Sequence, residues 1–323
     1  MNIYCDENIS QLILHLNNIY FTEKYQRIKN KYNLSFYQLS LKLFGNKFKD
    51  YKNYASEIIK NHNKKNINII TYTNELYPDN LRYIQTPPFV LFAKGNLNLL
   101  KNESKISIVG TRRPSPISCF YSKFISNFLS KHNYTIVSGM ASGIDSISHR
   151  GAIIEKGGTI GIIAHGLDHV YPQKNHDLFN LALNNNINDE KKNILLLSEY
   201  PLGVKPKNYH FPKRNRIITG LSKILFFIEG GIKSGALISV KYALNQGRDV
   251  YVLRHPFMKN NEGGENTHQE GALDLSNYFR SDIISDFEFK NNFSNTANNT
   301  FYMGNGLWCK FYEPSFSAPF FLE

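Results

Sequence analysis

One stretch, residues 106–146, constrains the fold of this chain more than any other. A short apolar run, residues 106–109, stops at Gly110, which predicts a buried parallel strand that ends in a tight turn. Two prolines in residues 111–116 disfavour a helix up to that point. Apolar residues then recur with helical spacing from position 117 to position 129. The pattern predicts a strand, a loop and a helix in succession.

The same pattern repeats at once. A second apolar run, residues 134–137, leads into a loop rich in Ser and Gly, residues 138–145. In a parallel sheet the two loops meet at the carboxyl edge, where open α/β sheets bind ligands. Further apolar runs alternate with helical stretches, which predicts a doubly wound, mostly parallel α/β sheet. These runs are residues 67–70, 89–92, 159–164, 194–197, 223–228 and 250–253.

Composition bounds the class of protein. The 323 residues are 41% hydrophobic, so a large core can be buried, and the formal net charge is +12. This charge fits either a Lys-rich composition or a polyanionic partner. Three scattered cysteines form neither a disulfide framework nor a metal spacing, which is typical of a reducing compartment. No membrane span, signal peptide, metal or cofactor is expected, and a cytoplasmic location is predicted.

The chain divides into three parts. Residues 1–66 predict a small helical domain, to which we assign no DNA contact because it lacks the Gly-x-Gly pattern of a helix-hairpin-helix. Residues 67–283 hold the α/β alternation. Residues 284–323 form a low-complexity tail, in which residues 291–300 are rich in Asn, Ser and Thr and are predicted to be mobile. We expect no further domain in this tail.

Four loops share a composition suited to phosphate. They lie at predicted strand ends and are rich in Gly, Ser, Arg, Lys and Asn; they are residues 110–115, 138–145, 205–216 and 230–235. Gly admits a ligand close to the backbone, helix N-termini add partial positive charge, and Arg and Lys add full charges. Neither a Gly-x-Gly-x-x-Gly fingerprint nor a P-loop is present. A mononucleotide or a nucleic-acid backbone therefore fits better than NAD or ATP.

Arg214, Asn215 and Arg216, close to Phe211, are the strongest sign of nucleic acid, because basic and aromatic side chains together hold single strands without sequence preference. The alternative is a structural salt bridge for Arg216 and a core position for Phe211. A structural role is less favoured for Arg112, because its loop offers the side chain few other interactions.

Two other groups of polar residues favour structural roles. Asp145 and His149 are four residues apart on a predicted helix, and we expect a helix cap and a packed histidine there. Residues 165–169 resemble a metal-ligand spacing only loosely and lack a matching second cluster.

At these loops the chain resembles the DNA-processing protein A family, also called DprA or Smf. The resemblance covers about residues 67–275 and rests on the stretches SIVGTRRPS (107–115), VSGMASGIDSISH (137–149), GGTIGIIAHGLDHVYP (157–172), SEYPLG (198–203), FPKRNRIITGLS (211–222) and SGALISVKYALNQGRDVY (234–251). It departs at Asn208, where some members carry Lys and this chain has Lys207 beside it, and at His255-Pro256, where members commonly have Pro-Gly. Many members end in a winged-helix domain, and the tail here is too short for one.

The resemblance implies an extended Rossmann-like fold and a non-enzymatic, homodimeric protein that binds and protects single-stranded DNA and loads the recombinase RecA during natural transformation. It implies phosphate contacts by Arg and Lys, stacking on Phe211 and a backbone cradle. The predicted DNA-binding residues are Gly110, Arg112, Ser138, Gly139, Gly143, Lys207, Phe211, Arg214, Asn215, Arg216, Ser234 and Gly235.

Two other functions stay open. Glu229-Gly230-Gly231 is similar to part of the Pro-Gly-Gly-x-Gly-Thr motif of the lysine-decarboxylase-like nucleotide phosphoribohydrolases, but the catalytic Glu that follows that motif is missing. The third possibility is a nucleotide-sensing regulatory module.

Overall fold

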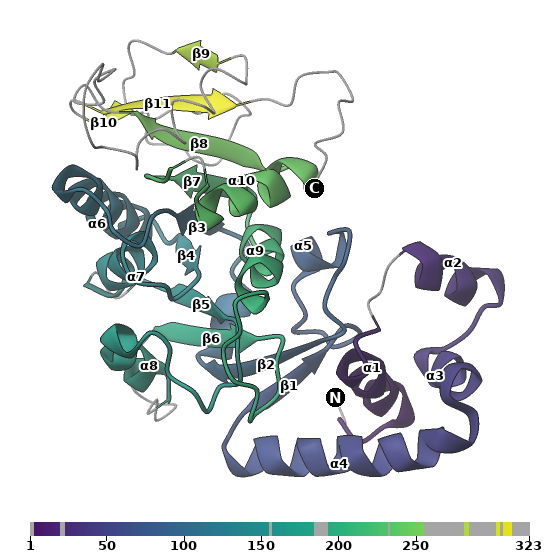
Figure 1. Ribbon diagram of the computed structural model, residues 1–323. Helices are drawn as coiled ribbons and strands as arrows, with labels where there is room; N and C mark the ends of the chain where they lie inside the picture. Colours follow the sequence, from purple (N-terminus) through teal and green to yellow (C-terminus); the bar gives the residue numbers. More distant parts are fainter. Residues whose placement is uncertain are drawn as a thin grey trace.

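The structure is a computed structural model, and it describes residues 3–19, 23–154, 157–183, 193–231, 233–254, 281–283, 302–303 and 306–311. Its centre is one mixed sheet (Figure 1). The strands lie in the order β1-β2-β6-β5-β4-β3-β7-β8-β11-β10, with β9 paired to β11. They are β1 (Asn68–Thr71), β2 (Val90–Gly95), β3 (Lys105–Val109), β4 (Thr135–Ser138), β5 (Thr159–Ile163), β6 (Ile194–Ser198), β7 (Ile224–Phe227), β8 (Asp249–Arg254), β9 (Ser281–Ile283), β10 (Tyr302–Met303) and β11 (Gly306–Phe311).

The run of neighbouring strands from β6 to β8 pairs in parallel, and the remaining pairs are antiparallel. The expected mostly parallel, doubly wound sheet is therefore confirmed. The apolar runs predicted as strands correspond to β1 through β8. Strands buried on both faces read as continuous apolar runs because helices cover each side.

Helices cover both faces of the parallel part (Figure 1). On one face α6 and α7 pack with Ile106, Ile108 and Ile136, and on the other α9 and α10 pack with Val109 and Val137. The helices of the α/β part are α5 (Asp79–Arg82), α6 (Pro116–Lys131), α7 (Ile144–Ile154), α8 (His176–Leu183), α9 (His210–Gly220) and α10 (Gly235–Asn245).

Among the described residues, four α-helices precede β1, where the sequence predicts a helical stretch: α1 (Asp6–Leu16), α2 (Glu23–Lys31), α3 (Phe36–Phe44) and α4 (Phe48–Lys64). They share one hydrophobic cluster with α8 and with β2 and β6 of the sheet. Two histidines also join them to the loop after β6. His15 Nε2 donates to the carbonyl of Glu199 (2.6 Å), and His62 Nε2 accepts from the backbone N–H of Leu202 (3.1 Å). The helical stretch is thus tied to a loop at the carboxyl edge of the sheet.

Beyond β8 the described part of the chain consists of three short strands. Of these, β11 pairs antiparallel with β8 and extends the sheet at that edge. The expected mobility of residues 291–300 lies outside the described residues. The division of the chain into domains at residues 66 and 283 stays a prediction.

Candidate functional site

The sheet has a topological switch point at β3. The chain runs from β3 through β4 and β5 to β6 on one side, and then places β7 and β8 on the other side. The connections after β3 and β7 therefore diverge, which is where open α/β sheets form a crevice. A cleft of about 880 Å³ opens there. A hydrogen bond from the backbone N–H of Thr111 to the carbonyl of Glu229 (2.7 Å) joins the two strand ends beneath it.

The loop after β3 supplies one wall. A Cβ at Gly110 would lie 2.6 Å from the side chain of Ile144, so only Gly lets this loop pass the start of α7. Arg112 and Arg113 follow and are exposed. The guanidinium carbon of Arg112 lies 5.6 Å from the ring centroid of Phe211 on α9. The expectation that Arg112 faces solvent at the carboxyl edge of the sheet is confirmed.

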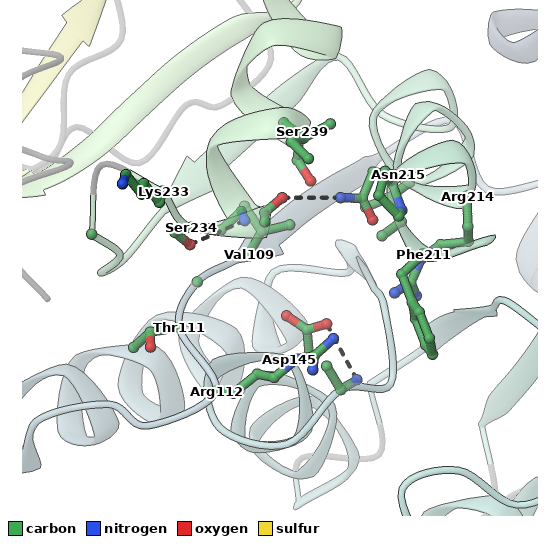
Figure 2. A pocket seen from close by; sticks show the side chains of 18 of the residues that line it. Val109, Thr111, Arg112, Asp145, Phe211, Arg214, Asn215, Lys233, Ser234 and Ser239 are labelled. Atoms are coloured by element: carbon green, nitrogen blue, oxygen red, sulfur yellow. Dashed lines mark hydrogen bonds between the residues drawn. The ribbon is translucent and has the colours of Figure 1, made fainter. Parts of the chain in front are cut away.

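The N-terminus of α10 supplies the second wall. Ser234 is its N-cap, with Oγ accepting from the N–H of Ala236 (3.1 Å), and a Cβ at Gly235 would meet nothing within 4 Å. Asn215 Nδ2 donates to the carbonyl of Gly235 (3.1 Å) and so joins α9 to α10. Lys233, one residue before the cap, is exposed. Figure 2 shows Lys233 and Ser234 on one side of the pocket, with Phe211 and Arg214 on the other.

The loop after β4 lies beside the loop after β3, as predicted. The N–H of Ile144 donates to the carbonyl of Thr111 (3.2 Å). Gly143 has φ +80°, and a Cβ there would lie 2.4 Å from that carbonyl oxygen. The sequence predicts that this loop forms the other wall of the cleft. Instead it lines mainly a smaller pocket next to Phe211, because the switch point lies between β3 and β7.

Two of the predicted residues in this loop face inward. Ser138 is fully buried, and its hydroxyl donates to the carbonyl of Ile108 (2.6 Å). Gly139 is needed for space, since a Cβ there would overlap the guanidinium of Arg214 and the carboxyl of Asp145. Both residues shape the loop, and a DNA contact by the Ser138 hydroxyl does not agree with its burial.

Arg214 lines the cleft but is only 4% exposed. Its Nη1 donates to the carbonyls of Gly139 and Ile162. Burial lowers the pKa of the guanidinium to about 10, and the nearby Asp145 carboxyl acts in the opposite direction. Burial likewise raises the pKa of Asp145, with Arg214 opposing. Arg214 therefore keeps its charge at neutral pH and holds the loop after β4 in place.

Arg216 is engaged elsewhere. Its Nη2 lies 2.5 Å from Glu199 Oε1, both side chains are at most 4% exposed, and Arg216 does not line the cleft. Burial alone would raise the pKa of Glu199, but its electrostatic interactions with Arg216, His15 and Lys213 outweigh this effect and lower that pKa. The predicted phosphate contact by Arg216 does not agree with this placement. The alternative left open by the sequence, a structural salt bridge, is what the structure shows.

Phe211 is half-buried and borders both pockets. Its ring centroid is 5.6 Å from that of Tyr171. Lys207 is exposed but lines neither pocket, and its Nζ lies 5.8 Å from the ring centroid of Tyr209. The neighbouring Asn208 lines the cleft instead.

The structure thus brings part of the predicted site together and separates the rest. Seven predicted residues line the cleft: Gly110, Arg112, Phe211, Arg214, Asn215, Ser234 and Gly235. Arg113 and Lys233 also line it, although neither is among the predicted DNA-binding residues. Their signal is available there, because each is a basic residue in one of the four loops selected by composition.

The packed histidine expected at His149 is confirmed, whereas Asp145 lies inside α7 and holds the loop before that helix instead of capping it. Asp145 Oδ2 accepts from the N–H of Ala141 (3.3 Å). His149 is fully buried, and its Nδ1 lies 2.6 Å from Thr159 Oγ1. Burial lowers the pKa of His149 to about 3, with Arg150 adding to the effect. Among the described residues no group of three His, Cys, Asp or Glu side chains could hold a metal ion.

Comparison with known proteins identifies the family. The model of the family described as "DNA recombination-mediator protein A" matches residues 68–287. The chain belongs to this family. It is 44% identical over 196 residues to the DNA processing protein DprA of Bacillus subtilis, and 38% identical over 220 residues to the protein Smf of Synechocystis. These matches cover 59% and 67% of this chain, but only 62% and 53% of the two relatives.

Solved structures agree with the family. DNA processing protein A of Streptococcus pneumoniae matches with a TM-score of 0.62 and 29% identity, over 79% of this chain and 88% of that one. The Helicobacter pylori protein, whose structure describes a single-stranded DNA binding mode, matches with a TM-score of 0.54 and 28% identity, over 66% and 89% of the two chains. The described part of this chain has no helix with both the length and the apolar character of a membrane span.

Proposed function

We propose that this protein binds single-stranded DNA in the cleft between β3 and β7, without sequence preference and without catalysis, and hands the strand to the recombinase RecA. The cytoplasm is the proposed site of action and a homodimer the proposed form. The family and the Helicobacter relative that binds single-stranded DNA support the choice of ligand.

The observation that carries the proposal is the set of cations around the cleft. Arg112, Arg113 and Lys233 are exposed, and within the described ranges none has a carboxylate partner. They surround the N-terminus of an eleven-residue helix, α10, whose first N–H groups carry partial positive charge. Phe211 adds an aromatic edge at which a base can stack. Phosphates and bases along one strand would meet these groups in turn.

The surroundings of Glu229 favour a binding protein over a nucleotide phosphoribohydrolase. Its Oε2 accepts from both the N–H and the hydroxyl of Ser115, at 2.8 and 3.0 Å, and Ser115 caps α6. A carboxylate engaged in this way stabilises the start of a helix and is poorly placed to activate water. Incubation with nucleotides should therefore give no turnover. Turnover that disappears in a Glu229→Gln variant would instead favour the hydrolase.

The binding test is a titration of a labelled oligonucleotide at several salt concentrations. Each neutralised phosphate of a single strand contributes about −0.7 to the slope of log affinity against log salt, so three cations predict a slope of about −2. An affinity that does not change with salt would contradict phosphate binding in the cleft.

RecA transfer and assembly need measurements of their own. If the protein loads RecA, RecA filaments should form faster on a single strand to which it is bound, and ATP hydrolysis by RecA reports their growth. Unchanged filament growth with intact DNA binding would remove RecA from the proposal. Light scattering should give twice the chain mass of 37.2 kDa, and the mass of one chain at micromolar concentration would argue against the dimer.

A further inference from the structure

Positive charge is concentrated in the first helices. Residues 1–65 hold eleven Lys and Arg against five Asp and Glu, a net charge of +6 in a chain whose total is +12. About a fifth of the sequence thus carries half of its net charge. A uniformly Lys-rich composition would spread the net charge evenly along the chain. The concentration of positive charge therefore favours this region as a contact for a polyanion.

The acidic residues with described side chains do not neutralise the ends of α2 and α3. Asp6 accepts from Lys52 Nζ (2.6 Å), and the Glu7 carboxylate accepts from backbone N–H groups in the first turn of α3. Asp50 and Glu57 lie on the exposed side of α4. The surface formed where α2 and α3 end is therefore dominated by its lysines.

An exposed aromatic ring sits among those lysines. Tyr32 directly follows α2 and is 52% exposed. Lys42 Nζ lies 4.3 Å and Lys31 Nζ 5.4 Å from its ring centroid, and neither lysine has an acidic partner among the residues described. Nearby, Lys29 Nζ lies 5.1 Å from the ring centroid of Phe36. We call Tyr32 with Lys29, Lys31 and Lys42 the Tyr32 patch.

The backbone holds this patch in place. The N–H of Tyr32 donates to the carbonyl of Ile28 (3.2 Å), and the N–H of Leu34 donates to that of Lys29 (2.9 Å), which closes the turn after α2. A reciprocal capping box between Ser35 and Gln38 fixes the start of α3. Both helices lie on the outer side of the helical region, away from the sheet (Figure 1). The ring is thus presented to solvent by a fixed turn, so little ordering is needed when a ligand binds.

We propose that the Tyr32 patch is a second contact for single-stranded DNA, outside the cleft; the choice of ligand rests on the proposed function. A flat exposed ring flanked by ammonium groups suits a base and its neighbouring phosphates. The contact between the lysines and the ring is weak at an exposed site, so phosphates can draw the lysines away. A paired duplex offers no free base face for the ring, which favours single strands.

The Tyr32 patch gives this region a DNA contact that the sequence does not indicate. The missing helix-hairpin-helix pattern excludes one mode of DNA binding, whereas stacking combined with lysines needs no such motif. The patch forms because the fold places Lys42, at the end of α3, over the ring of Tyr32. No local pattern in the sequence predicts this contact.

The test compares a short strand of about six nucleotides, which fills the cleft alone, with a long strand of about forty, which can reach both contacts. In the full-length protein, Tyr32→Ala should weaken binding of the long strand roughly five- to hundredfold, the range for one stacked base. The Lys31→Glu, Lys42→Glu double variant should make the salt slope for the long strand shallower by about 1.4, since two phosphate contacts are lost. Binding of the short strand should not change.

Matched controls lie on α4 of the same region. Tyr54 is also 52% exposed, and Lys60 and Lys64 are exposed lysines. Tyr54→Ala and the Lys60→Glu, Lys64→Glu double variant therefore repeat each change without touching the patch. A long strand carrying 5-iodouracil should in addition cross-link to Tyr32 on irradiation.

The outcomes separate this proposal from the proposed function. Control variants that lose as much affinity as the patch variants would show a diffuse charge effect and overturn the patch. Unchanged binding of the long strand with a normal thermal melt would also overturn it, as would a loss confined to stimulation of RecA, which would make the patch a protein contact. Absence of binding by the unmodified protein to either strand would refute the proposed function itself.

Discussion

Replacing Arg112 with Ala separates DNA binding from folding. The guanidinium is exposed and, within the described residues, makes no hydrogen bond or ion pair; its one described contact is with the ring of Phe211 at 5.6 Å. Losing that contact should cost the folded state at most about 0.5–1 kcal/mol. Losing a charge-assisted hydrogen bond to a phosphate should cost the complex about 1.5–3 kcal/mol, or roughly ten- to hundredfold in affinity. Arg112→Lys should recover only part of this, because an ammonium cannot bind a phosphate through two parallel N–H groups.

The assay is a fluorescence titration with a short single strand at fixed salt, run beside a thermal melt. Arg150→Ala is the control, since this partly exposed Arg on α7 pairs with Asp177 at 2.7 Å and does not line the cleft. We expect the control to bind as the unmodified protein does. Unchanged affinity of Arg112→Ala with a normal melt would remove Arg112 from the site. If Arg112→Ala lost affinity and also had a lowered melting temperature, Arg112 would have a structural role instead.

Three further predictions concern stability. Arg216→Ala should lower the free energy of unfolding in urea by about 3–5 kcal/mol, because it leaves the charge of Glu199 buried without its main partner; an unchanged urea midpoint would contradict this. The unfolded chain protonates His149 near its ordinary pKa of 6.5 and the folded chain only near 3, so its stabilisation is present above pH 6.5 and lost progressively as pH falls toward 3, by up to about 1.4 kcal/mol per pH unit. Stability measured against pH should therefore be flatter in His149→Gln. Gly143→Ala should lower the melting temperature more than Gly203→Ala. Both residues have positive φ, but of the two only Gly143 has a backbone oxygen, 2.4 Å away, that an added Cβ would meet. Equal shifts would show that the backbone strain of positive φ accounts for the whole effect.

The sequence predicts the strands and the edge that carries the site, because both follow from local chemistry. The apolar side chains of residues 106–109 are removed from water only if the strand is buried on both faces. The loops that follow residues 106–109 and 134–137 must then lie at the same edge of the sheet. The order of the strands is different. Nothing in the apolar run 223–228 shows that it pairs with β3 on the side opposite β4. Because that pairing places the switch point, the prediction for the wall opposite Arg112 is incomplete: the loop after β4 borders both pockets, but the N-terminus of α10 lines the larger one as well.

The basic motif on α9 shows why charge counted along a sequence overstates the charge that is exposed to a ligand. Successive residues of a helix point about 100° apart, so Arg214, Asn215 and Arg216 leave the axis in three directions. Arg214 reaches the carbonyl of Gly139, Asn215 the carbonyl of Gly235, and Arg216 the buried carboxylate of Glu199. Arg214 and Asn215 therefore hold the loops of the cleft in place, and Arg216 forms a buried ion pair outside it.

The guanidinium groups on α9 can be buried only because these oxygens accept their hydrogen bonds. The oxygens belong to residues that are distant from α9 in the sequence. The cations left for a ligand come from loops, where Arg112, Arg113 and Lys233 have no such acceptors among the described residues. In the proposed function, exposed charge beside a helix N-terminus would bind the phosphate, and buried charge would fix the geometry of the cleft. Substitutions should divide in the same way, with loop cations changing affinity and helix cations changing stability.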